Sequence, residues 1–121
     1  MWVVIKYKSR EFEILKDSFS KVLGEMPEFY NPKYKYEKYI NNRLKQFETE
    51  ILNNYAICRH DKFMDPKVIS LLKNTRGLNY FLEGARFNQK EIIKFINLCK
   101  SSEDSSGYLT QSFFNLIEST K

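Results

Sequence analysis

The sequence predicts an α+β fold, in which an antiparallel four-stranded sheet and flanking helices form an α/β sandwich. Strand-like and helix-like segments follow one another in the order strand, helix, hairpin, strand, helix, strand, helix. That order is typical of helices packed on an antiparallel sheet. The clearest stretch is residues 51–82, where two strands and the helix between them have marked ends. Of the 121 residues, 42% are hydrophobic, which is enough to enclose one core but hardly two.

The N-terminal half is expected to contain a strand, a helix and a hairpin. Bulky, β-branched residues at 2–7 favour an inner strand. Ser9 can cap the helix that follows, and Gly24 is expected to end it. Residues 29–51 approach a strand-like alternation on both sides of Asn41-Asn42, which predicts a solvent-exposed hairpin with a polar tip. The apolar positions of the helix repeat with a helical period: Phe12, Leu15, Phe19, Val22 and Leu23.

The second half is expected to contain two further strands and two helices. A strand at 55–60 precedes a helix with Asp65 as its N-cap and Pro66 as its first residue. Gly77 is expected to stop that helix in a left-handed conformation, and a strand at 78–82 follows. Asn88 opens a segment with the spacing of a capping box, which predicts a third helix.

The domain organisation is read from a change of composition near residue 100. Residues 1–100 are expected to form the folded domain. Residues 101–107 are Ser, Glu, Asp and Gly only, which predicts a flexible linker. Residues 108–121 are apolar at helical spacing, so we expect this C-terminal segment to dock back or to begin a neighbouring module.

Charge and cysteine content limit the function classes. The net charge of +5 biases the surface towards polyanions, although scattered charges of both signs are also ordinary on a soluble surface. Cys58 and Cys99 lack the spacing of metal or redox sites, so we expect buried free thiols. No apolar run approaches the roughly twenty residues that span a bilayer. We therefore expect a cytoplasmic protein without membrane contact.

Cys58 and His60 are the one candidate pair for catalysis. Two residues apart on a strand, they share a face and could form a nucleophile pair or half of a metal site. The sequence offers no third ligand, orienting partner or Gly-rich oxyanion turn. We therefore expect no catalytic site, metal or cofactor, with Cys58 in the core and His60 at the surface.

Several short motifs together resemble one known family. They are Trp2-Val3-Val4-Ile5, Lys8, Asn54-Tyr55, Asp65-Pro66, and Asn74-Thr75-Arg76-Gly77 followed by Phe81. The order and spacing of these motifs resemble those in the N-terminal domain, or NGN domain, of NusG-type transcription elongation factors. The resemblance is closest to the specialised RfaH-like paralogues. The resemblance covers residues 1 to 100, and the small β-barrel of the KOW type that follows in the family has no counterpart here. At residues 51–55 the family has Leu-Phe-Pro-Gly-Tyr or Leu-Phe-Pro-Asn-Tyr, where this chain has Ile-Leu-Asn-Asn-Tyr.

The resemblance implies a monomeric domain that binds RNA polymerase. In the family, an apolar depression docks on the coiled-coil clamp helices of the largest polymerase subunit, which keeps the clamp closed and reduces pausing and termination. Tyr55, Ile57 and Phe81 match positions that line this depression, and Lys6 falls where the paralogues often carry an aromatic. For Tyr55, Ile57 and Phe81, packing in the protein's own core is the alternative interpretation. For Lys6, the alternative is an edge of the depression that is reshaped or ion-paired.

The resemblance also implies contact with the non-template DNA strand. Lysine and arginine bind phosphates, and an exposed base can be read by Asn or stacked on Arg. The alternatives are that Arg76 forms an ion pair at a helix end and that Lys21 is an ordinary solvated lysine. The matching positions are Lys8, Ser18, Lys21, Lys73, Asn74, Thr75 and Arg76.

A rival hypothesis is an α+β module that binds single-stranded RNA through the predicted hairpin. Aromatic residues interleaved with lysines can stack on bases and contact phosphates. They also suit a hairpin whose aromatics cover its own base. The residues in question are Tyr34, Tyr36 and Tyr39, beside Lys33, Lys35 and Lys38.

Overall fold

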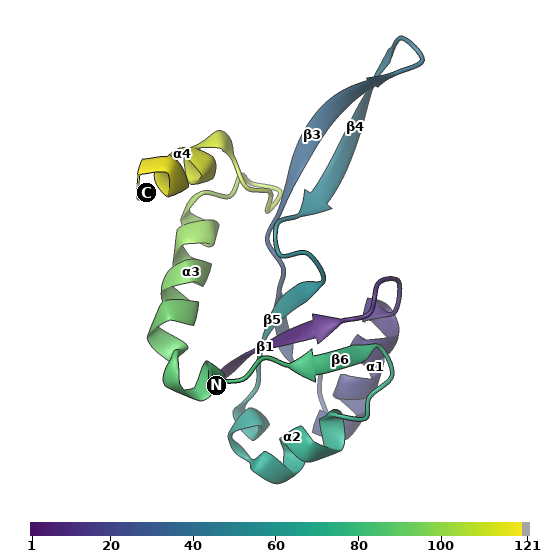
Figure 1. Ribbon diagram of the computed structural model, residues 1–121, viewed down its shortest axis with the longest axis vertical. Helices are drawn as coiled ribbons and strands as arrows, with labels where there is room; N and C mark the ends of the chain where they lie inside the picture. Colours follow the sequence, from purple (N-terminus) through teal and green to yellow (C-terminus); the bar gives the residue numbers. More distant parts are fainter. Residues whose placement is uncertain (120–121) are drawn as a thin grey trace. The chain divides into compact units, whose positions relative to one another are not determined.

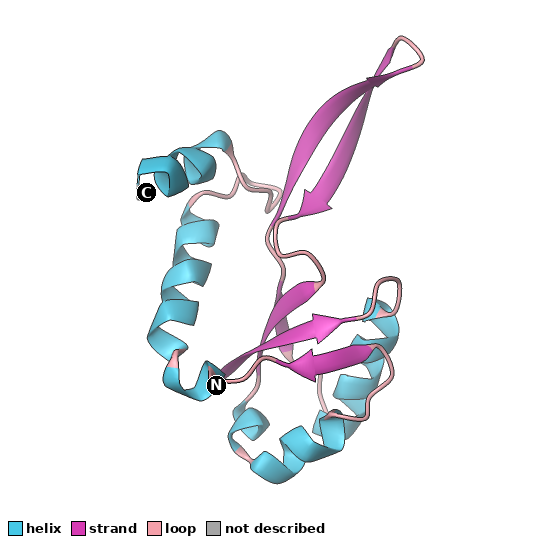
Figure 2. Cartoon of the chain, in the orientation of Figure 1, coloured by secondary structure: helices cyan, strands magenta, loops and turns pink. Residues whose placement is uncertain are grey.

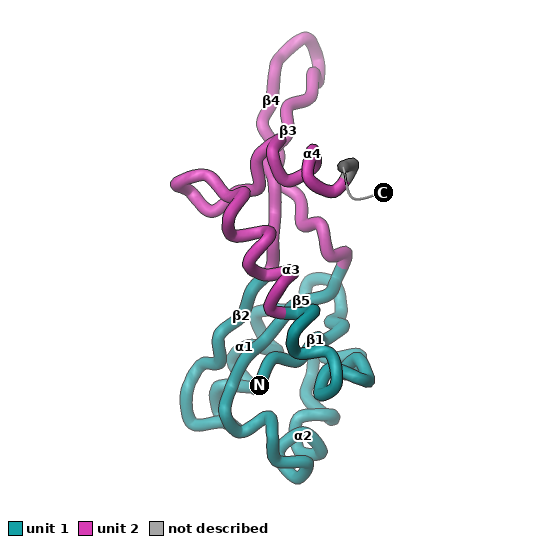
Figure 3. Tube along the Cα trace, turned by 90° about the vertical axis from the view of Figure 1, so that its left-hand side faces the viewer, with its two compact units in different colours: residues 1–30, 54–92 teal, residues 31–53, 93–121 magenta. Residues whose placement is uncertain are grey.

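The structure, a computed structural model, describes residues 1–119 of the chain. It divides into two compact units, shown in Figure 3. The sheet unit consists of residues 1–30 and 54–92, and the hairpin unit consists of residues 31–53 and 93–119. Among the described residues, no helix combines the length and apolar character needed to cross a bilayer.

The sheet unit is an α+β structure built on four antiparallel strands, as the sequence predicts (Figures 1 and 2). The strand order is β2-β5-β1-β6, so β1 and β5 are central. Two short 3-10 helices, η1 (Asp61–Met64) and η2 (Ala85–Phe87), lie in its loops. The remaining elements are β1 (Trp2–Tyr7), α1 (Phe12–Leu23), β2 (Glu28–Tyr30), β5 (Tyr55–Arg59), α2 (Pro66–Leu72) and β6 (Leu78–Phe81).

The core of the sheet unit lies on one face of the sheet. Burial alternates along β1, so that Val3, Ile5 and Tyr7 are buried while their neighbours are not. The buried stripe of α1 packs on this face through Leu15, Phe19 and Leu23, which are at most 1% exposed. The even-numbered residues of β1 therefore lie on the opposite face.

The ends of the helices follow the predicted signals in part. Asp65 caps α2 by accepting a hydrogen bond from the Lys67 N–H at 2.9 Å, and Gly24 ends α1 with φ of 83°. The predicted cap at Ser9 is wrong, because α1 begins only at Phe12. Arg10 takes a left-handed conformation with φ of 71°, which a right-handed helix cannot include.

Gly77 has the predicted left-handed conformation, with φ of 93°, but it does not end α2. The helix already ends at Leu72, and its C-cap residue is in the right-handed region. A Cβ on Gly77 would lie 2.6 Å from the Glu11 carbonyl oxygen and 3.2 Å from the Leu15 Cβ. Glycine is therefore required here by the close approach of the α1 backbone.

The hairpin unit contains the predicted hairpin, formed by β3 (Lys33–Ile40) and β4 (Arg43–Glu50). Asn41 and Asn42 have φ of 53° and 63°, as a two-residue type I′ turn requires. These strands form a two-stranded sheet of their own, and the fourth strand of the larger sheet is β2, which the sequence did not predict. Helix α3 (Gln89–Ser101) begins in the sheet unit and continues into the hairpin unit.

Residues 101–107 were expected to be a flexible linker, but Ser101 is the last residue of α3 and residues 102–107 form a hydrogen-bonded turn. The Asp104 carboxylate accepts from the N–H groups of Ser106 and Tyr108, and the Thr110 N–H donates to the Ser102 carbonyl. The chain then docks on the hairpin, where the Leu109 N–H donates to the Lys33 carbonyl at 2.8 Å, and continues into α4 (Gln111–Ser119). The assignment of 1–100 as one domain and of 108–121 as the start of another segment stays a prediction.

Candidate functional site

The open face of the four-stranded sheet brings two of the predicted polymerase-binding residues together. Lys6 on β1 lies opposite Tyr55 of β5 on one side and opposite Tyr80 of β6 on the other. Residues directly opposite each other project to the same face. The Lys6 ammonium lies 4.3 Å from the centre of the Tyr55 ring, and the hydroxyls of Tyr55 and Tyr80 are 3.0 Å apart. We call Lys6, Tyr55 and Tyr80 the tyrosine face.

The other two predicted residues of this group are placed differently. Ile57 pairs with Val4 on the same face as Tyr55, but it is only 3% exposed. Phe81 lies opposite Ile5, on the core face, where its ring stacks on Phe19 with centroids 6.1 Å apart. Phe81 therefore packs in the core of the sheet unit, which was its alternative interpretation, whereas Ile57 is buried on the opposite face of the sheet.

Tyr80 is the residue that sequence reasoning missed at this site. Its side chain is 46% exposed, as is that of Leu82, whose N–H donates to the Val4 carbonyl at 2.8 Å. The hydrogen bond with Tyr55 raises the pKa of Tyr80 above the ordinary tyrosine value. Only the alternation of residues 78–82 could have indicated Tyr80, and that pattern does not say which set of side chains faces the core.

The predicted DNA-binding residues fall into two groups. The Lys8 N–H donates to the Gly77 carbonyl at 2.7 Å, which joins the loop after β1 to the turn between α2 and β6. We call residues 8–10 and 73–76 together the basic loop pair. Ser18 and Lys21 lie outside it, on α1, seven and ten residues beyond Glu11, which corresponds to about 10 and 15 Å along the helix axis. The basic loop pair contains Lys8, Lys73, Asn74, Thr75 and Arg76, and it adds Arg10, which sequence reasoning missed.

Arg76 is in an ion pair but remains accessible. Its Nε lies 3.3 Å from a carboxylate oxygen of Glu11, and its side chain is 71% exposed. An exposed ion pair of this kind contributes little to stability. Arg76 therefore forms the ion pair predicted at a helix end. Its guanidinium has further N–H groups that can donate to an anion, so the ion pair is compatible with a role in anion binding.

Cys58 and His60 have structural surroundings. Burial raises the pKa of the Cys58 thiol, so it stays protonated. His60, predicted at the surface, is 8% exposed; it caps η1 by accepting the Lys62 N–H on Nδ1, and its Nε2 lies 2.8 Å from Glu25. Within residues 1–119, no group of three or more His, Cys, Asp or Glu side chains could hold a metal ion.

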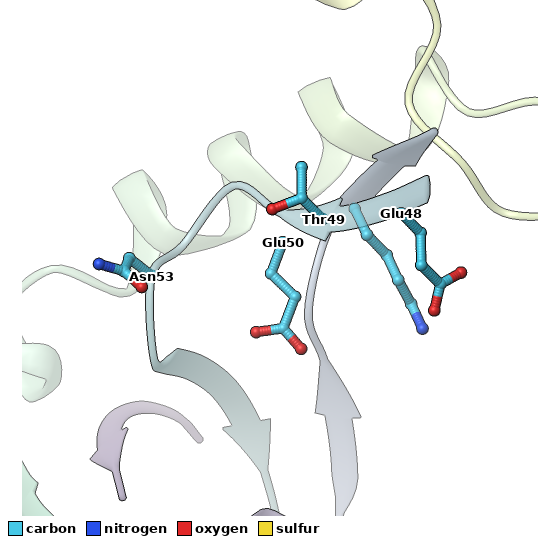
Figure 4. Close-up of a pocket in the computed structure, with 5 residues that line it drawn as sticks. Glu48, Thr49, Glu50 and Asn53 are labelled. Atoms are coloured by element: carbon cyan, nitrogen blue, oxygen red, sulfur yellow. The ribbon is translucent and has the colours of Figure 1, made fainter. Parts of the chain in front are cut away.

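In the hairpin unit, a hollow of about 310 Å³ lies at the base of β3 and β4 (Figure 4). Both carboxylates of this hollow, those of Glu48 and Glu50, already have partners. Glu48 accepts a hydrogen bond from the Tyr108 hydroxyl, and this hydrogen bond lowers the pKa of Glu48. Lysine neighbours lower it further. The lining is polar and consists of Lys33, Glu48, Thr49, Glu50 and Asn53.

The residues of the rival hypothesis do not act from one face. Tyr34, Tyr36 and Lys38 alternate with Lys33, Lys35 and Tyr39 along β3 and so project to opposite sides of the hairpin.

No known protein-family model matches the chain, and no curated protein is significantly similar to it in sequence.

Proposed function

We propose that the chain is a domain of a transcription elongation or antitermination factor. It docks on the clamp helices of the largest RNA polymerase subunit and contacts the non-template DNA strand, which suppresses pausing or termination. The observation that carries this proposal is the tyrosine face, where Tyr55 and Tyr80 share a hydrogen bond and the Lys6 ammonium lies over the Tyr55 ring. The role is one of binding in the cytoplasm, as a monomer on polymerase, and involves no catalysis.

The tyrosine face has the chemistry of an interface anchor. Tyrosine combines a large apolar ring with a polar tip, and interface hot spots are enriched in it. The hydrogen bond between Tyr55 and Tyr80 restrains both rings before binding, which reduces the entropy lost on association. Leu82, two residues after Tyr80 and equally exposed, adds an apolar side chain for contact with the side of a helix.

The basic loop pair supplies the DNA contact of the proposal. Lys8, Arg10, Lys73 and Arg76 are exposed and can neutralise phosphates. Asn74, exposed in the same turn, carries an amide that can read the edge of an unpaired base. Glu11 offsets one of these positive charges.

The test compares binding of the full chain to bacterial core RNA polymerase and to a core whose clamp helices are deleted. Tyr55→Ala and Tyr80→Ala are each expected to weaken binding about tenfold or more, since loss of a hot-spot residue is worth at least about 1.4 kcal/mol. Tyr39→Ala is the matched control, because Tyr39 is 72% exposed in the hairpin unit. Equal binding to the two polymerases would overturn the proposal.

A further inference from the structure

The two faces of the β3–β4 hairpin differ in charge. The structure describes every residue from Lys33 to Glu50. Among them, the basic face contains Lys38, Arg43 and Lys45 and no carboxylate. The opposite face, which we call the mixed face, contains two lysines against three glutamates. By strand alternation, the basic face consists of Tyr34, Tyr36, Lys38, Ile40, Arg43, Lys45, Phe47 and Thr49.

Lys38 and Lys45 lie directly opposite each other on the basic face. Like charges in such a cross-strand pair destabilise a hairpin. Within residues 1–119, neither lysine is in a salt bridge that would offset the repulsion. The stability of the hairpin itself therefore does not account for this pair, whereas an anion held between the two ammonium groups would relieve it.

An aromatic platform adjoins these charges. Tyr36 is 42% exposed and stacks on Phe47 of the facing strand, with ring centroids 5.6 Å apart and planes at 23°. Tyr34, one step closer to the base, is half-buried against Phe114. Tyr36 is thus the aromatic of this face that is both held in place and open to a ligand, and Lys38 and Lys45 follow it towards the tip.

We propose that the basic face of the hairpin binds single-stranded nucleic acid. Lys38, Arg43 and Lys45 contact successive phosphates, and Tyr36 stacks on an unpaired base. A duplex keeps its bases stacked on one another and would leave the ring unused. An acidic protein surface would use the cations but would not need the ring. This site is separate from the tyrosine face and the basic loop pair, so either proposal can fail without the other.

The experiment measures fluorescence anisotropy of labelled 12-residue oligouridine and oligothymidine with the full chain carrying Arg76→Ala, which weakens the basic loop pair. Three neutralised phosphates predict a slope of log K against log salt of about −2. Lys45→Gln is expected to weaken binding severalfold and to make this slope shallower by about 0.7. Lys35→Gln, on the mixed face of the facing strand β3, is the matched control with the same change in charge.

The stacking contact is tested by Tyr36→Leu against Tyr39→Leu. Loss of one base–aromatic stack is expected to weaken binding about fivefold or more, with the salt slope unchanged. Tyr39 is more exposed than Tyr36 but lies on the mixed face, so its replacement is expected to have little effect. Tighter binding of one oligonucleotide than the other would support the site and identify its ligand as RNA or DNA.

Stability measurements separate loss of binding from loss of folding. Lys45→Glu replaces a like-charge pair by an opposite-charge pair, so the melting temperature is expected to stay the same or rise while binding is lost. Equal effects of the basic-face variants and their mixed-face controls would overturn the proposal, as would no binding of either oligonucleotide at low salt. If polyglutamate competes fully and Tyr36→Leu has no effect, the face binds acidic protein and the proposal is also overturned.

Discussion

The phenolic oxygens of Tyr55 and Tyr80 lie 3.0 Å apart, although β1 separates their strands in the sheet. Strands two positions apart are about 10 Å from each other, so the two side chains must lean towards one another across Lys6. The Lys6 ammonium occupies the space beside them, over the Tyr55 ring. One residue from each of three strands thus forms a single ordered surface.

The first prediction concerns the ionisation of this pair. The hydrogen bond with Tyr55 raises the pKa of Tyr80, so Tyr55→Phe is expected to lower it towards the ordinary tyrosine value. Because the pKa of Tyr80 is raised on folding, its contribution to stability is fully present below pH 10 and is lost as pH rises through the folded value. NMR titration of the Tyr80 ring measures the shift, and Tyr39→Phe is the control. An unchanged pKa in Tyr55→Phe would contradict the contact.

The second prediction concerns Gly77, which lies in the turn between α2 and β6 and closely approaches the start of α1. Gly77→Ala is expected to lower the free energy of unfolding by about 1–3 kcal/mol. The new methyl group would clash with the Glu11 carbonyl oxygen, and alanine is strained in the left-handed conformation of residue 77. Denaturant unfolding followed by circular dichroism measures the loss. Gly107→Ala is the matched control, since Gly107 has a similar φ of 83° and open space around it. Equal losses in the two variants would show that the close approach to Glu11 is not the cause.

The elements of the fold were largely predictable because their ends carry local signals. Asp65-Pro66 marks the start of α2, Gly24 ends α1, and Asn41-Asn42 forms the hairpin turn. β2 was not predictable, since three residues are too few to show an alternation. The late start of α1 was missed as well. Arg10 adopts a left-handed conformation, and an arginine, unlike a glycine or asparagine, does not signal this conformation in the sequence.

The candidate site was predictable only to the level of the strand. Residues 78–82 alternate, so two sets of side chains could have faced the open side. The register of β6 on β1 decides between them, placing Phe81 opposite Ile5 in the core and Tyr80 opposite Lys6 outside. Such a register depends on a pairing between residues more than seventy positions apart, for which a local sequence pattern holds no information.

The third prediction uses the ion pair between Glu11 and Arg76 to test the DNA contact. Arg76→Ala is expected to weaken binding of single-stranded DNA, because it removes a charge and a bidentate donor from the basic loop pair. Glu11→Gln is expected to act in the opposite direction. It removes the competing carboxylate 3.3 Å from the Arg76 Nε, so binding should tighten about twofold or more at low salt.

The matched control for these opposite effects is a second ion pair of the sheet unit. Arg59 and Glu28 are joined at 2.9 Å between β5 and β2, and both are accessible. If the basic loop pair binds DNA, Arg59→Ala and Glu28→Gln change affinity less than their counterparts, although the change in net charge is the same. Affinities are measured with oligothymidine in the chain carrying Lys45→Gln, which weakens the hairpin site. Weaker binding by Glu11→Gln would show that Glu11 organises the loop pair for DNA rather than competing with it.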